Sequence, residues 1–164
     1  MAVPIRTGKK TLAGYALLWL LVLLVLIGLM LSQAALVYSQ DAQRQREKEL
    51  LKTGDKLREA IEQYYDQSPG LVKQHPASLS ALLNDTRFPN TKRHLRKIPR
   101  DPMTGAEDWG LVLDQFNNIM GVYSLGVQRP IKRYGFPTRY KDFEKKQTYS
   151  EWVFAHSLVP LTDQ

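Results

Sequence analysis

The chain has 164 residues, a formal net charge of +7 and no cysteine, so disulfides, thiol catalysis and thiolate metal sites are excluded. Lysine and arginine alternate with aspartate and glutamate through most of the second part of the chain. That pattern is typical of a solvated surface, and we therefore expect no nucleic-acid partner despite the basic balance.

A short basic leader, residues 1–14, opens the chain. It holds Arg6, Lys9 and Lys10 and no acidic residue. Because positive flanking charge is retained on the cytoplasmic side of a membrane, we expect a cytoplasmic N-terminus and a periplasmic C-terminal domain.

An uncharged, predominantly apolar segment follows from Thr11 to Gln40. A membrane-spanning helix needs roughly 20 apolar residues, so the pattern predicts a transmembrane helix over 15–39 in a bacterial inner membrane, surrounded by lipid. A cleaved signal peptide is the alternative, but its apolar region would be shorter. Gly28 and Ser32 are four residues apart, which permits close helix contact in assembly; ordinary anchor composition explains them equally well.

Residues 40–67 predict an amphipathic continuation of the same helix, since no proline interrupts the chain before Pro69. Gly54 lies within the apolar stripe, where glycine costs about 1 kcal/mol relative to alanine. We expect close approach of another backbone there, that of a sheet laid across the stripe; a tolerated weak point is the alternative. The stripe consists of Leu50, Gly54, Leu57, Ile61 and Tyr64, and the opposite face of Lys48, Lys52, Lys56 and Glu59.

Residues 68–164 predict a loop and antiparallel-sheet domain. Two short helices are expected, one after a Ser78 N-cap and one over 91–96. Asn117 and Asn118 predict a turn between the first two strands, and a basic loop over 126–146 precedes the third. The three expected strands are 109–114, with Trp109, Leu111 and Leu113 on one side, 119–124, and 151–159, with Trp152, Phe154 and Leu158 on one face. The fold class is therefore α+β, a long N-terminal helix packed on a small antiparallel sheet.

No set of residues indicates catalysis. His75, His94 and His156 are widely separated and share no metal-ligand spacing. The sequence contains no phosphate-binding glycine loop and no nucleophile elbow. We therefore expect neither an enzyme nor a bound cofactor or metal.

Three motifs behind the leader and apolar helix resemble the type IV pilin and type II secretion pseudopilin family, most closely its major pseudopilins, general secretion pathway protein G. HPASLSALL (His75–Leu83) is similar to the family's tyrosine-proline-x-serine-leucine segment. HLRKIPRDPMTG (His94–Gly105) is similar to its isoleucine-proline-x-aspartate-proline connection, and GVYSLG (Gly121–Gly126) to the end of its second strand. The resemblance extends from Gly14 to Gly126 and implies a pilin-like fold.

The resemblance also implies a processing site. In the family, a prepilin peptidase cuts after a glycine that follows a basic leader, and the new N-terminus is methylated. Gly14 and Tyr15 occupy that junction in this chain.

Two positions depart from the family pattern. Trp19 stands where the fifth mature residue is usually a glutamate that pairs with a neighbouring subunit's N-terminal amine. The loop in which the family binds calcium is basic here, and Asp142 and Glu144 among lysines make a poor cage, so calcium is not expected.

The resemblance implies a structural subunit of a type II secretion pseudopilus or type IV pilus-like filament, stored in the inner membrane and assembled through its N-terminal helix. Its partners would be copies of itself or other pilin-like subunits, the prepilin peptidase and the inner-membrane platform of the secretion machine. The alternative is a permanently anchored periplasmic binding or adaptor module that is neither cleaved nor polymerised. A weaker third idea is that Lys132, Arg133 and Arg139 of the basic loop contact lipid headgroups or an acidic partner.

Overall fold

The computed structural model describes the backbone of residues 12–156 and the side chains of residues 15–31 and 38–156. The chain divides into two compact units, Met1–Ala42 and Gln43–Gln164, and each is described by itself. Because the description begins at residue 12, most of the basic leader lies outside the described residues.

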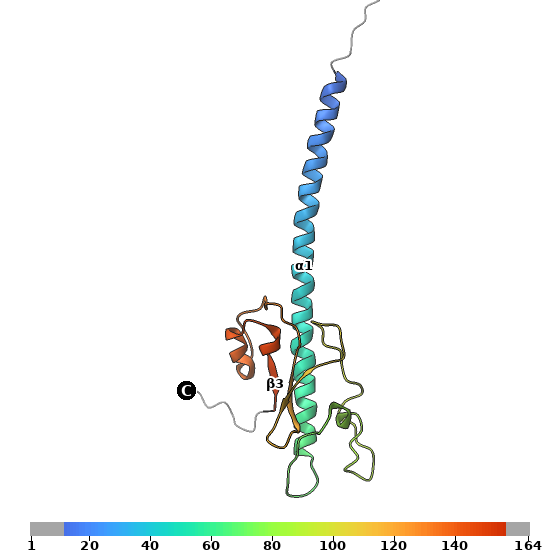
Figure 1. The fold of residues 1–164 in the computed structure, drawn as a ribbon, viewed down its shortest axis with the longest axis vertical. Helices are drawn as coiled ribbons and strands as arrows, with labels where there is room; N and C mark the ends of the chain where they lie inside the picture. The colour runs from blue at the N-terminus through green and yellow to red at the C-terminus, as the bar shows by residue number, and fades with distance from the viewer. Residues whose placement is uncertain (1–11, 157–164) are drawn as a thin grey trace, which may run out of the picture. The chain divides into compact units, whose positions relative to one another are not determined.

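One long helix, α1 (Leu12–Asp66), contributes to both units (Figure 1). Its bounds confirm the prediction that the apolar and amphipathic segments belong to one helix. It stops just before Ser68-Pro69-Gly70, where Gly70 adopts a φ of 86° that side chains disfavour.

The prediction of a transmembrane helix over 15–39 is wrong. Among the residues that the structure describes, no helix is both long and apolar enough to cross a membrane. The expected single-pass location in the inner membrane, with a cytoplasmic N-terminus and a periplasmic C-terminal domain, is corrected on the same finding.

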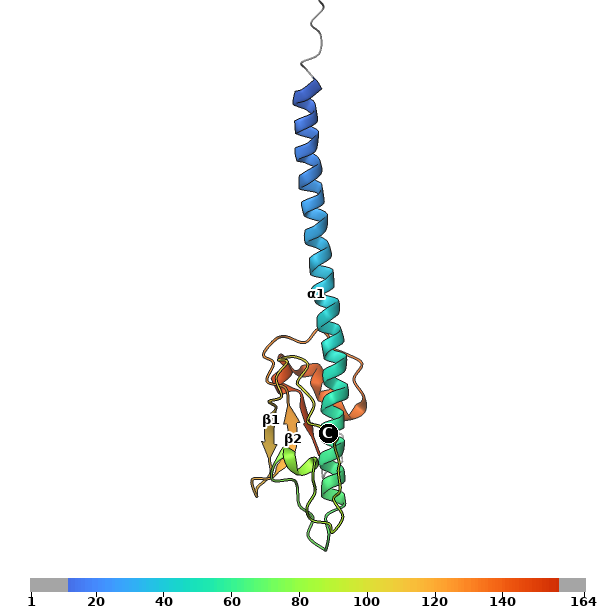
Figure 2. The same cartoon turned by 90° about the vertical axis from the view of Figure 1, so that its right-hand side faces the viewer.

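The fold class is α+β, as predicted, with a small antiparallel sheet. The three described strands, β1 (Gly110–Leu113), β2 (Ile119–Tyr123) and β3 (Val153–Ala155), lie in the order β1-β2-β3. Within the second unit the sheet lies along α1 (Figures 1 and 2). Asn117 adopts a φ of 65° in the β1–β2 turn, which confirms the predicted role of asparagine there.

The predicted side-chain face of the first strand is correct only in part, because Leu111 and Leu113 share one exposed side but Trp109 lies outside the strand. Trp109 is buried, but Leu111 and Leu113 are 42% and 45% exposed. The strand begins only at Gly110, and the Trp109 indole donates a hydrogen bond of 2.9 Å to the carbonyl oxygen of Pro99. Trp109 is therefore positioned by the preceding loop, outside the alternation of the strand.

The third strand is shorter than predicted. It covers only Val153–Ala155, with Trp152 and Phe154 fully buried as expected. Leu158 lies outside the described residues.

Of the two predicted short helices, only the one after Ser78 is present. The segment after Ser78 is a 3-10 helix, η1 (Leu79–Leu82), and the Ser78 side chain makes no capping hydrogen bond. Residues 91–96 form no helix, because the backbone N–H of Asp85 bonds to the carbonyl of Lys92 as an isolated bridge. The adjacent N–H groups of His94 and Leu95 both donate to the carbonyl of Leu82.

The amphipathic pattern of α1 is confirmed within the second unit. All five stripe residues are buried and the four residues of the opposite face are exposed. A Cβ added at Gly54 would lie 2.5 Å from the ring of Phe154 in β3. The sheet does approach the helix at this glycine, but the approaching group is an aromatic side chain.

Candidate functional site

The sequence-predicted assembly residues lie on an exposed apolar segment in the first unit. Tyr15 and Trp19 are each 70% exposed. Among the described residues, no atom beyond the surrounding turns of helix lies within 4 Å of a Cβ built at Gly28. At Gly14 and Ser32 the structure describes the backbone only. The large apolar side chains of residues 15–31 range from 41% exposed at Val22 to 72% at Met30.

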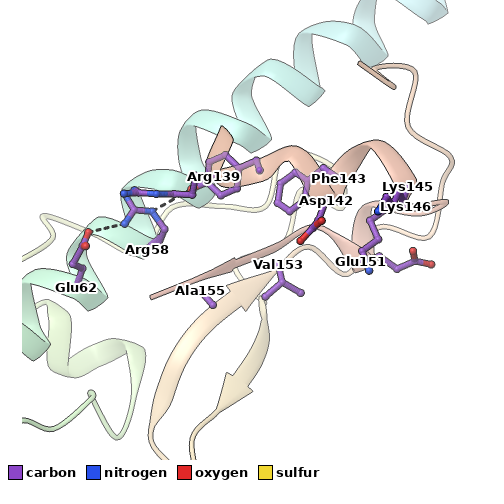
Figure 3. A pocket seen from close by; sticks show the side chains of 11 residues that line it. Arg58, Glu62, Arg139, Asp142, Phe143, Lys145, Lys146, Glu151, Val153 and Ala155 are labelled. Atoms are coloured by element: carbon purple, nitrogen blue, oxygen red, sulfur yellow. Dashed lines mark hydrogen bonds and ion pairs between the residues drawn. The ribbon is translucent and has the colours of Figure 1, made fainter. Parts of the chain in front are cut away.

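A pocket of about 380 Å³ lies within the second unit, between α1, the end of the basic loop and β3 (Figure 3). The loop part that reaches it folds as the 3-10 helix η2 (Thr138–Lys145), and a further 3-10 helix, η3 (Tyr149–Glu151), leads into β3. The pocket is lined by Arg58, Glu62, Arg139, Tyr140, Asp142, Phe143, Lys145, Lys146, Glu151, Val153 and Ala155.

Arg58 forms the inner wall of this pocket and is only 3% exposed. Its guanidinium donates to Asp55 at 2.9 Å, to Glu62 at 2.6 Å and to the Tyr140 hydroxyl at 3.1 Å. A buried cation needs such partners, and these satisfy it. The positive charge of Arg58 is therefore used in contacts within the protein.

The same group of side chains shifts two pKa values. Burial raises the pKa of Tyr140, and its hydrogen bond to the Asp55 carboxylate raises it further. Burial also acts to raise the pKa of Asp55, but hydrogen bonds from Tyr140 and Arg58 outweigh it and hold that pKa below its usual range. Tyr140 therefore stays neutral near neutral pH, and its hydroxyl proton is held by Asp55.

Glu47 is a site residue that the sequence did not reveal. It is 3% exposed on α1, and its carboxylate accepts hydrogen bonds from the backbone N–H groups of Ile131 (2.6 Å) and Lys132 (3.1 Å). The Tyr149 hydroxyl donates to it at 2.9 Å. Glu47 therefore attaches the basic loop to α1. Its only signal in the sequence is a charge on the buried side of the helix.

The structure brings two of the three histidines together. The rings of His75 and His156 are 5.6 Å apart, and His75 Nδ1 lies 2.9 Å from an Asp114 carboxylate oxygen. His94 is separate and pairs with Asp85 at 3.2 Å. Across the described part of the chain, no group of three or more potential ligands could hold a metal ion. Glu144, one of the two acids of the basic loop, accepts a hydrogen bond from the Gly135 N–H.

The described side chains thus offer an exposed apolar segment in one unit and a pocket bordered by cations in the other. Comparisons with protein-family models, with curated proteins and with solved structures found no match to this chain. The function must therefore be argued from these two features.

Proposed function

We propose that the protein is a pilin-like structural subunit that assembles through its N-terminal helix into a filament such as a type II secretion pseudopilus or a type IV pilus. The observation that carries the proposal is the exposed apolar segment of residues 15–31. Soluble proteins rarely expose contiguous apolar surface of this kind unless another molecule covers it. Copies of the same helix, packed side by side, would cover it.

The second unit supports a structural role. Its aromatic core holds a small sheet against α1, which suits a folded head that decorates a helical filament core. The contacts include stacked rings of Phe143 and Trp152 5.2 Å apart and the packing of Phe154 against Gly54. The family resemblance of the sequence motifs adds to this proposal, with prepilin peptidase as the expected processing partner at Gly14 and Tyr15.

Trp19 affects how neighbouring subunits would align along the filament. A glutamate at this position pairs with a neighbour's N-terminal amine in the family, whereas an exposed indole offers apolar area and one N–H donor. Register in this protein would then come from side-chain packing along residues 15–31 instead of from a charge pair.

Two measurements test the proposal. The intact mass of the native protein should correspond to a chain that begins at methylated Tyr15; a chain that retains Arg6 to Gly14 contradicts processing. In sedimentation, the full chain should form large assemblies, and Leu24→Glu should abolish them because a charge would enter the dry core. Leu111→Glu is the matched control, since Leu111 is an exposed leucine of the second unit. A wild-type chain that sediments as a monomer would contradict the filament proposal.

A second candidate function is a protein-binding adaptor that does not polymerise. The pocket of Figure 3 favours it, because Arg139, Lys145 and Lys146 border it close to a strand edge. The two candidates separate in the same sedimentation experiment, since an adaptor would show no assembly that depends on Leu24.

A further inference from the structure

One side of strand β3 has no strand partner among the described residues. The sheet order is β1-β2-β3, and β3 pairs only with β2. An unpaired strand edge presents free backbone N–H and C=O groups, which can pair with another extended chain. Whether this edge can bind such a chain depends on the side chains that lie beside it.

The register identifies which groups face outward. Phe154 pairs with Val122, and the N–H of His156 donates to the carbonyl of Met120 at 2.8 Å. Residues of an antiparallel strand alternate in the side to which their backbone groups point. The backbone groups of Phe154 and His156 therefore point to β2, and those of Val153 and Ala155 point away from it.

Val153 and Ala155 are also the two β3 residues that line the pocket of Figure 3. The two strand residues whose backbone groups point away from β2 are thus among those that line the pocket of about 380 Å³. Val153 itself is 38% exposed. An extended chain entering the pocket would meet both residues along the strand edge.

Some charged side chains around the pocket already have partners within the protein, and others form no ion pair. Glu62 is held by Arg58, and Glu151 accepts hydrogen bonds from the Gln147 N–H and the Thr148 hydroxyl. In the described part of the chain, Arg139, Lys145 and Lys146 form no ion pair within 4.0 Å. With Arg58 they make four cations in the pocket lining, against the three carboxylates of Glu62, Asp142 and Glu151. The chain as a whole carries a net charge of +7.

We propose that this pocket binds an extended, acidic peptide segment of a partner protein, which adds as a strand to the free edge of β3. Backbone hydrogen bonds to Val153 and Ala155 would give the pairing, and carboxylates at alternate positions would meet Arg139, Lys145 and Lys146. The alternating geometry of a strand places every second side chain on one face, which suits a partner with Asp or Glu at every second residue. This binding is independent of whether the chain polymerises.

The test uses the full chain and two fluorescent peptides of equal charge, an eight-residue alternating Val-Glu peptide and an eight-residue alternating Pro-Glu peptide. Proline lacks the N–H that a strand must donate, so the second peptide should bind at least about tenfold more weakly in fluorescence anisotropy. With the Val-Glu peptide bound, amide hydrogen exchange should slow in the segment that contains Val153 and Ala155.

Matched variants identify the edge and the charges. Val153→Pro should weaken Val-Glu binding at least about tenfold, because it removes an outward N–H without breaking the pairing to β2. Leu111→Pro is its control, since by the same alternation Leu111 has its backbone groups on the free edge of β1. Reversal of charge at Arg139, Lys145 and Lys146 should abolish binding, whereas reversal at the exposed Arg93, Arg96 and Lys97 should change it less than about twofold.

Several outcomes would overturn the proposal. Equal binding of the two peptides, or equal binding of an eight-nucleotide oligothymidine, would mean general attraction of polyanions by the cations. Undiminished binding to a folded Val153→Pro variant would exclude the β3 edge. If that variant does not fold, as judged by circular dichroism, the exchange measurement on the wild-type chain decides, and unchanged exchange at residues 153–155 rejects the proposal.

Discussion

The two parts of α1 use the same secondary structure for opposite purposes. In the first unit, residues 15–31 carry large apolar side chains that are all exposed, whereas in the second unit Leu50, Leu57 and Ile61 are fully buried. An apolar residue that is buried contributes to the free energy of unfolding, and an exposed one does not. The difference means that substitutions in the first region should affect association, and those in the second should affect folding.

The largest expected effect comes from the aromatic core. Phe154→Ala should lower the free energy of unfolding by about 3–5 kcal/mol, because it removes a fully buried ring that packs on α1 at Gly54. Leu23→Ala, in the exposed region, should change it by less than about 0.5 kcal/mol. Urea unfolding followed by tryptophan fluorescence measures both, and similar losses in the two variants would refute the contrast.

The loop attachment should show the next largest effect. Glu47→Ala leaves the N–H groups of Ile131 and Lys132 and the Tyr149 hydroxyl without their acceptor, so we expect a loss of about 2 kcal/mol. Glu49→Ala removes an exposed glutamate of the same helix and serves as the control. Limited proteolysis should also cleave the 126–137 loop faster in Glu47→Ala alone; equal cleavage in both variants would argue against the attachment.

A pair of glycine substitutions should change stability in opposite directions. Gly54→Ala should destabilise by about 1–2 kcal/mol, because its Cβ would collide with the Phe154 ring. Gly28→Ala meets nothing within 4 Å and should raise helix content, since alanine is favoured over glycine by about 1 kcal/mol in a helix. Thermal melts and circular dichroism compare them, and the same sign for both would break the comparison.

The smallest expected effect is a dependence on pH confined to the second unit. Burial lowers the pKa of His156, so the folded state binds its proton less readily than the unfolded state. Stability from this group is complete above the ordinary histidine pKa of about 6.5 and is lost as the pH falls below it. His156→Gln should flatten the stability profile in that window, as measured by urea titrations between pH 7 and pH 5. A stability increase on acidification in the wild-type protein would contradict the sign.

A second step should follow at lower pH. Hydrogen bonds from Arg87 hold the pKa of Asp85 well below its ordinary value of about 3.9, and burial only partly opposes this. Stability from Asp85 is therefore present above that ordinary value and declines as the pH falls toward the folded-state pKa. Asp85→Asn should remove this step and leave the histidine step in place, and an unchanged acid limb in that variant would disprove the assignment.

Local patterns predicted the elements better than their contacts. The helical stripe from Leu50 to Tyr64 and the turn at Asn117 follow from side-chain periodicity and from backbone preferences, which act within a few residues. That Trp109 lies outside the first strand could not be predicted, because its position depends on a hydrogen bond to Pro99 in the preceding loop.

By itself, the sequence determined the long helix, its apolar and amphipathic parts, the antiparallel hairpin and the α+β class, because each depends on residues that are neighbours along the chain. Only the tertiary structure decided that Phe154 fills the space left by Gly54, that Glu47 holds the loop at Ile131, and that the edge of β3 meets the cations of η2. These contacts join residues that lie far apart in the chain. Their partners are selected by packing and by the need to satisfy buried polar groups, which no local pattern records.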